Sequence, residues 1–141
     1  MFLHHSLEIQ FHRCPDCTWR ADRTRTVAGA GVTVLAAIIT SDSVDHLALE
    51  AGSEIYALVK AQWVILTMDE NIKTSARNRL TGTVVRCQEG AVNTEIVIEL
   101  AGGKTVVAII TNESVRELGL KEGVRATALI KASHIILAVV S

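Results

Sequence analysis

An internal repeat at a spacing of 71 residues constrains the fold of this 141-residue chain more than any other feature. The segment from Ala37 to Leu66 aligns without a gap with the segment from Ala108 to Leu137, and about half of the aligned positions are identical. Such periodicity is typical of tandem copies of one structural unit. We therefore expect two units, 1–70 and 71–141, each small for an independent hydrophobic core.

The first copy departs from the second over its front part. Residues 29–67 follow the repeat, whereas residues 1–28 do not match it and hold three of the five histidines and two of the three cysteines. Alternation of polar and apolar residues is also poor there, so strands are not indicated. We interpret residues 1–28 as a front half that has diverged or been replaced.

The second copy has the pattern of a small all-β unit. β-Branched residues and polar–apolar alternation predict strands, and Gly102-Gly103 predicts a tight hairpin turn. Thr111 or Asn112 is suited to cap one short helix. The expected strands are 79–87, 94–100, 105–110, 124–132 and 135–140, with a helix at 113–118; the first copy repeats the second half with strands 32–40, 54–61 and 63–67 and a helix at 42–48.

Five strands with one inserted helix fit a small OB-like barrel, which leaves no exposed sheet edge. The predicted fold class is therefore all-β with one short helix per repeat, arranged as two five-stranded barrels in tandem. A chain that starts at residue 71 is expected to fold and assemble without the first copy.

Composition excludes several classes of protein. Apolar residues make up 49% and charged residues 21%, which is typical of a folded chain rather than a disordered one. With 14 basic and 15 acidic residues, the chain has no overall positive field for nucleic acid. No apolar run is long enough to cross a membrane, and the first residues lack the order of a secretory signal, so we expect a cytoplasmic protein.

Four side chains of the second copy share one chemical property, since all of them donate hydrogen bonds. They are Ser75, Arg77, Ser114 and Lys131. A donor-only set suits a tetrahedral oxyanion, and Arg with Lys supplies both a planar fork and a point charge. On these residues alone, a surface arginine, a helix-capping serine and a solvated lysine are the simpler explanation.

Several longer segments of the second copy make the oxyanion interpretation more specific. SARNRLTGTV, EGAVNTEIVIEL, AGGKTVVAIITNESVRELGL and a following KAS occur in order, and ITSDSV and KAQWVILT repeat the later part in the first copy. The chain thereby resembles the molbindins, the Mop-type (TOBE-like) molybdate-binding domains, over essentially all of 74–141 and again over 32–67. It is similar to a tandem di-Mop protein with a divergent first repeat.

The resemblance implies a set of oxyanion contacts, which transfer position by position. They are Ser75, Arg77, the backbone of Ala76 and Asn78, Ser114 and Lys131 in the second copy, with Ser43 and Lys60 in the first. The first copy has no counterpart of the SARN or EGAVN segments, so Ser43 and Lys60 would need an arginine from a neighbouring barrel. Residues 90–93 either line a further site near an oligomer axis or form a turn.

The function that the resemblance implies is cytoplasmic binding and storage of molybdate, with tungstate as a second ligand, for molybdenum homeostasis. It implies sites between barrels, a homo-oligomer of three two-domain subunits, and no enzyme activity, nucleic-acid partner or membrane. Molybdate is a dianion, so its site needs positive charge and donors. Selection against sulfate would come from cavity size, and a protonated phosphate would find no acceptor.

Two other functions compete with oxyanion binding. Cys14 and Cys17 form a C-x-x-C pair near three histidines, which suits zinc, but the second ligand pair lacks finger-like spacing and we assign no metal site. A nucleic-acid-binding OB module would need stacking aromatics, and the second copy has none. No helix-turn-helix pattern precedes the repeats, Cys87 fits a small buried side chain better than a nucleophile, and Trp63 fits packing.

Overall fold

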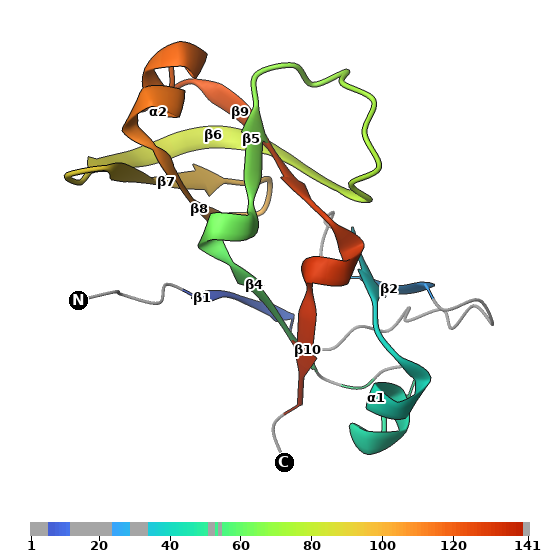
Figure 1. The fold of residues 1–141 in the computed structure, drawn as a ribbon. Helices are drawn as coiled ribbons and strands as arrows, with labels where there is room; N and C mark the ends of the chain where they lie inside the picture. The colour runs from blue at the N-terminus through green and yellow to red at the C-terminus, as the bar shows by residue number, and fades with distance from the viewer. Residues whose placement is uncertain (1–5, 12–23, 29–33, 51–52, 54, 140–141) are drawn as a thin grey trace.

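The structure, a computed structural model, describes residues 6–11, 24–28, 34–50, 53 and 55–139. Antiparallel strands dominate it, and Figure 1 shows them in chain order. The elements are β1 Ser6–Phe11, β2 Thr24–Ala28, β3 Val34–Ile38, α1 Ser41–His46, β4 Ile55–Lys60, the 3-10 turn η1 Ala61–Trp63, β5 Ile65–Thr67, β6 Asn78–Glu89, β7 Asn93–Glu99, β8 Thr105–Thr111, α2 Asn112–Leu118, β9 Arg125–Ile130, η2 Ala132–His134 and β10 Ile136–Ala138.

The strands form three sheets in the described part of the chain. The largest has the order β5-β9-β6-β7-β8, the second β1-β4-β10, and the third pairs β2 with β3. The edge strands β5 and β8 of the largest sheet contact each other, as they must if the sheet curls toward a barrel. This confirms a mostly β fold with one short helix per copy. The closure of two separate barrels stays a prediction.

The two copies pair their strands in the same register at the repeat spacing of 71 residues. Leu7 lies opposite Val59 in β1–β4, as Asn78 lies opposite Ile130 in β6–β9. The pairing of β2 with β3 likewise repeats that of β7 with β8. The front of the first copy, where the sequence indicated no strands, therefore keeps two strands of the repeat. Backbone hydrogen bonds do not depend on side-chain identity, which is why the sequence pattern missed them.

The last strand of each copy belongs to a sheet of the other copy. In β5 of the first copy, Leu66 lies opposite Ala128 of β9. In β10 of the second copy, Leu137 lies opposite Ala57 of β4. These two pairs are equivalent at the repeat spacing, so the exchange is reciprocal. The sequence units 1–70 and 71–141 are therefore not the units in which the sheets are built.

The exchanged strands join one continuous apolar core. The buried cluster contains Leu35, Ala57 and Val59 of the first copy together with Ile96 and Ile98 of the second. Burial of this aliphatic surface is the main stabilising term of the fold. Because the described core is shared, each copy buries more apolar surface than it would alone.

The short helices begin at equivalent caps. Thr111 accepts a hydrogen bond from the backbone N–H of Ser114 at 3.1 Å, and Thr40 accepts one from Ser43 at the same distance. A threonine oxygen at this position replaces the missing intrahelical acceptor of the first turn. The predicted cap of the second-copy helix is therefore confirmed at Thr111.

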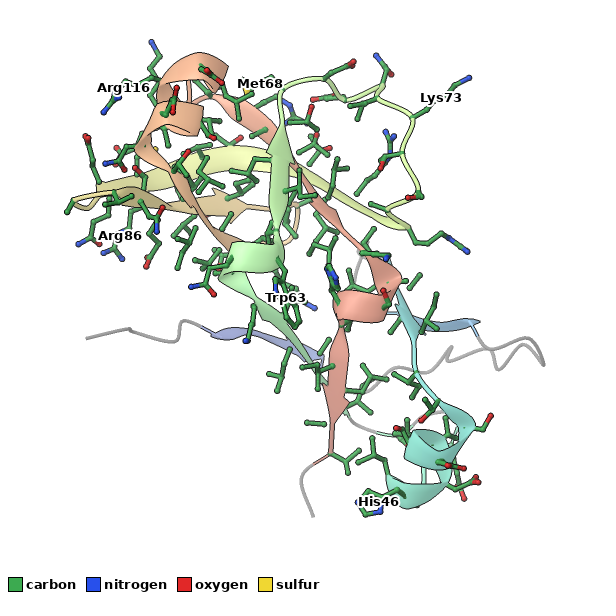
Figure 2. All side chains as sticks on the ribbon, viewed as in Figure 1. His46, Trp63, Met68, Lys73, Arg86 and Arg116 are labelled. Atoms are coloured by element: carbon green, nitrogen blue, oxygen red, sulfur yellow. The ribbon has the colours of Figure 1, made fainter. Side chains whose placement is uncertain are left out.

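Trp63 lies where the two copies meet. Its ring stacks on that of His134, with centroids 4.9 Å apart, and the two residues are equivalent at the repeat spacing. Figure 2 shows Trp63 near the middle of the molecule, between the large sheet and the strands below it. The stack joins η1 and η2 across the axis that relates the copies, which supports the packing role expected for Trp63.

The long strand β6 needs two backbone irregularities. Val85 is an extra residue in β6, because the pairing with β7 shifts between Val84 and Arg86, and such a bulge bends the strand. At Gly82, a Cβ atom would collide with the carbonyl oxygen of Glu99 on the neighbouring strand. Glycine is therefore required at this close approach of β6 and β7.

The predicted glycine turn is also confirmed. Gly102 and Gly103 have φ angles of 89° and 83°, which are positions that favour glycine, and they connect β7 to β8.

Candidate oxyanion-binding site

Arg77 and Lys131 meet at one end of the β6–β9 pair. Asn78 and Ile130 lie opposite each other as the last pair of the ladder, so Arg77 precedes one strand where Lys131 follows the other. Both side chains are exposed. Among the described residues, no ion pair joins either cation to a carboxylate. This end of the sheet thus offers a fork and a point charge without a competing acid.

The equivalent end of the first copy has a single cation. Ser6 lies opposite Lys60 in the β1–β4 register, at the position that Arg77 and Lys131 hold in the second copy. The sequence therefore places a serine where the second copy has a guanidinium. The Nζ of Lys60 lies 5.1 Å from the centre of the Trp63 ring, a cation–π distance.

The loop between β5 and β6 carries two more of the predicted contacts. Ser75 is exposed, and the backbone N–H of Ala76 donates to the Thr74 hydroxyl at 3.3 Å. The Ala76 N–H therefore has a local acceptor in this structure. A bound anion would replace that weak, long bond.

The Asn78 side chain is structural rather than free for a ligand. It is 2% exposed, and its Oδ1 accepts from the backbone N–H of Ala36 at 2.6 Å. Its Nδ2 donates to the carbonyl oxygens of Ala36, at 2.8 Å, and of Ile130, at 3.1 Å. The amide thus imitates a strand and ties β6 to β3 of the first copy. Only the backbone of Asn78 fits the predicted role.

Ser114 and Ser43 lie away from this cationic end. α2 follows β8 and contacts the far end of β6, where Arg116 pairs with Glu89 at 3.8 Å. The 12 residues of β6 separate the two places by roughly 35 Å of strand, at about 3.3 Å per residue. Ser43 lies in α1, at the bottom of Figure 1. No hydrogen bond of the described residues joins either serine to Arg77 or Lys131.

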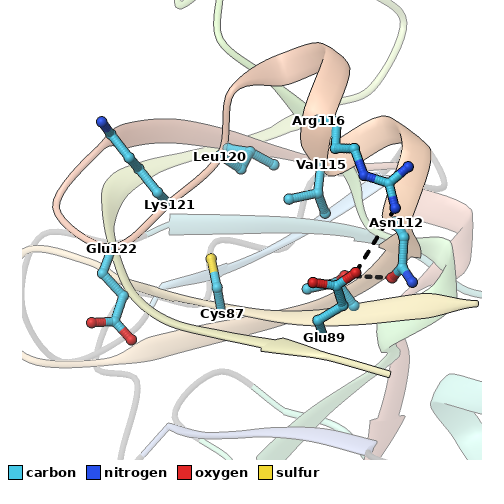
Figure 3. A pocket seen from close by; sticks show the side chains of 9 residues that line it. Cys87, Glu89, Asn112, Val115, Arg116, Leu120, Lys121 and Glu122 are labelled. Carbon is cyan, nitrogen blue, oxygen red and sulfur yellow. Dashed lines mark hydrogen bonds and ion pairs between the residues drawn. The ribbon is translucent and has the colours of Figure 1, made fainter. Parts of the chain in front are cut away.

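A groove beside α2 has different chemistry. It has a volume of about 430 Å³ and is lined by the end of β6, α2 and the loop after it (Figure 3). Two carboxylates, Glu89 and Glu122, face it together with Arg116 and Lys121, so its mixed charge does not favour an oxyanion. Burial, and then the charge of Glu122, raise the pKa of Cys87. The thiol stays protonated at neutral pH, which agrees with a packing role.

Residues 90–92 form the turn between β6 and β7. Asn112 holds it to α2: its Nδ2 donates to the Gly90 carbonyl at 2.9 Å, and its backbone N–H donates to the Val92 carbonyl at 2.9 Å. Thr94 donates to the Asn112 Oδ1 at 2.6 Å. Sequence analysis missed this connection, because Asn112 and Gly90 are 22 residues apart.

The competing metal site falls mostly outside the described residues. Cys14, Cys17 and His12 lie there, and so do His4 and His5. Within the described ranges, no group of three His, Cys, Asp or Glu side chains is arranged to hold a metal ion.

Membrane insertion was tested on the same ranges. None of the helices described there is both long and apolar enough to span a bilayer.

Comparison with known proteins identifies the family. The sequence model of the TOBE domain matches residues 25–66 and 74–137, most of the chain. The molybdenum transport protein ModE of Azotobacter vinelandii is 44% identical over 105 residues, and the molybdenum-pterin-binding protein MopA of Rhodobacter capsulatus is 48% identical over 105 residues. Each match covers 74% of this chain, which spans about two fifths of either relative, 39% and 40%.

A solved structure agrees with these relatives. The molybdate-bound form of the cytoplasmic molybdate-binding protein ModG matches with a TM-score of 0.80 and 46% identity, over 83% of this chain and 84% of that one. The chain therefore belongs to the TOBE-domain family. Within that family it is of the molbindin type, in agreement with the segments SARNRLTGTV and EGAVNTEIVIEL.

Proposed function

We propose that this protein binds molybdate, and tungstate as a related anion, and that it stores or buffers the anion in the cytoplasm without enzyme activity. The observation that supports this most directly is the pair Arg77 and Lys131 at one sheet end, with Ser75 in the adjoining loop. Two cations and several donors compensate a dianion, and no described carboxylate pairs with them. The relatives named for molybdenum or molybdate support the same ligand.

The separation of the contacts supports a homo-oligomer. Arg77 and Lys131 lie at one end of β6, whereas Ser114 lies in the helix near its other end. A site that uses all three must therefore join two subunits. We propose an assembly of three two-domain subunits in which Ser114 of one chain faces Arg77 and Lys131 of another.

The tandem organisation is part of the same proposal. We propose two Mop-like units, 1–70 and 71–141, of which the first is divergent over residues 1–28 and complete from 29 to 67. The common register of the two copies supports the duplication. With Ser6 in place of an arginine, Lys60 and Ser43 form a weaker half-site that depends on a neighbouring chain.

Replacing Arg77 by alanine tests the proposed site. We expect the dissociation constant for molybdate to rise by about 10-fold to 100-fold, because a charged hydrogen-bond donor contributes about 1.5–3 kcal/mol. Arg86→Ala is the matched control, since Arg86 is an exposed arginine near the other end of the same strand. Equilibrium dialysis with molybdenum quantified by mass spectrometry gives both constants. Equal loss of affinity in the two variants would contradict the assignment.

A further inference from the structure

The loop of residues 68–77 is held at its first turn by two arginines that the predicted site does not include. Arg79 of β6 donates from Nη1 to the backbone carbonyl of Glu70 at 2.9 Å. Arg125 of β9 donates from Nε to the Glu70 carboxylate at 3.3 Å. Glu70 is thus gripped through its main chain from one strand and through its side chain from the neighbouring strand.

The turn around Glu70 is itself ordered by local hydrogen bonds. The backbone N–H of Asp69 donates to the Thr67 hydroxyl at 3.1 Å, and that of Asn71 donates to the Asp69 carboxylate at 2.9 Å. The next anchor along the chain is Asn78, whose amide is bonded to β3 and β9. Ser75 and Arg77 therefore lie on a short segment fixed at both ends.

We infer that Glu70, Arg79 and Arg125 are positioning residues for the oxyanion site. They do not reach the anion themselves, but they fix the near end of the segment that carries Ser75 and Arg77. A ligand that needs these two groups in one place binds more tightly when the segment is already ordered, because less conformational entropy is lost on binding. This inference rests on the proposed molybdate function.

The sign of one substitution separates positioning from charge. Glu70→Ala removes a negative charge from the neighbourhood of an anion site, so electrostatics alone predicts tighter molybdate binding. Loss of the clamp predicts the opposite. We expect the dissociation constant to rise about threefold to tenfold, within the range of a partly exposed, hydrogen-bonded ion pair.

Glu89→Ala is the matched control. Glu89 also pairs with an arginine, Arg116 at 3.8 Å, but at the far end of β6 and away from the loop. We expect its molybdate affinity to stay within about twofold of the wild type, since an exposed charge at that distance is screened. In an Arg77→Ala background, Glu70→Ala should have no further effect, because the group it positions is gone.

Hydrogen exchange supplies a readout that does not depend on the ligand. In Glu70→Ala, amides of residues 69–77 should exchange faster while the β6–β9 ladder keeps its protection. Unchanged or tighter molybdate binding by Glu70→Ala, with a clear loss in Arg77→Ala, would overturn the positioning role and leave the proposed function intact. Absence of molybdate binding by the wild type would instead overturn the proposed function and this role with it.

Discussion

Asn78→Leu is expected to destabilise the protein by about 3 kcal/mol. The substitution keeps the approximate size of the side chain but removes three hydrogen bonds in a site that is 2% exposed. It leaves the N–H and C=O of Ala36 without their partner, and each unsatisfied buried group costs about 1–3 kcal/mol. The loss also unties β3 of the first copy from β6 of the second.

Denaturant unfolding of wild type, Asn78→Leu and Asn71→Leu measures this effect. Asn71 is the matched control, because it is exposed and only its backbone N–H makes a hydrogen bond to Asp69. We expect Asn71→Leu to stay within about 0.5 kcal/mol of the wild type. An Asn78→Leu variant as stable as Asn71→Leu would show that the bridge to Ala36 does not hold the copies together.

A fragment of residues 71–141 is expected to assemble by exchanging β10 between two chains. The fragment lacks β5, so the edge of β9 opposite Leu66 loses its partner. It also lacks β4, so β10 is left unpaired. An open edge and a free strand of matching register are the conditions for exchange between copies, and β10 is the repeat equivalent of β5.

Light scattering after gel filtration tests this prediction, together with the dependence of the unfolding temperature on protein concentration. We expect assemblies of even numbers of fragments and a higher unfolding temperature at higher concentration. A fragment shortened to 71–134, without β10, should not fold cooperatively. A monomeric fragment with a concentration-independent transition would mean that β10 folds back onto its own β9, and exchange would then not be required.

The repeat made much of the fold predictable. An ungapped spacing of 71 residues correctly placed β3, α1, β4 and β5 of the first copy from their equivalents in the second. The hairpin at Gly102 and the cap at Thr111 followed from conformational preferences that act over a few residues. Local chemistry of this kind is visible in a sequence because no distant partner is involved.

The exchange of strands was not predictable from the same repeat. The spacing relates β5 to β10, but it is unchanged whether each strand pairs within its own copy or with the other. The two arrangements satisfy the same register and bury the same side chains, Leu66 and Leu137. The choice depends on the direction of the chain through η1 and η2, which three-residue turns set in space rather than in sequence.

The candidate site was predicted in part for a related reason. Arg77 and Lys131 do flank one strand pair, so their proximity followed from the expected strands. The role of the Asn78 side chain was missed because Ala36 is 42 residues away, and the clamp on Glu70 was missed because Arg125 is 55 residues away. Ser114 and Ser43 remain predicted contacts whose test requires the assembled protein.

The central claim is that the chain selects molybdate at sites built on Arg77 and Lys131. Isothermal titration of the intact protein with molybdate, and separately with sulfate, tests it most directly. The account predicts saturable binding of molybdate, little heat with sulfate, and a stoichiometry that reports how many sites survive with Ser6 in place of an arginine. A folded, assembled protein that binds neither anion, or binds both equally, would contradict it.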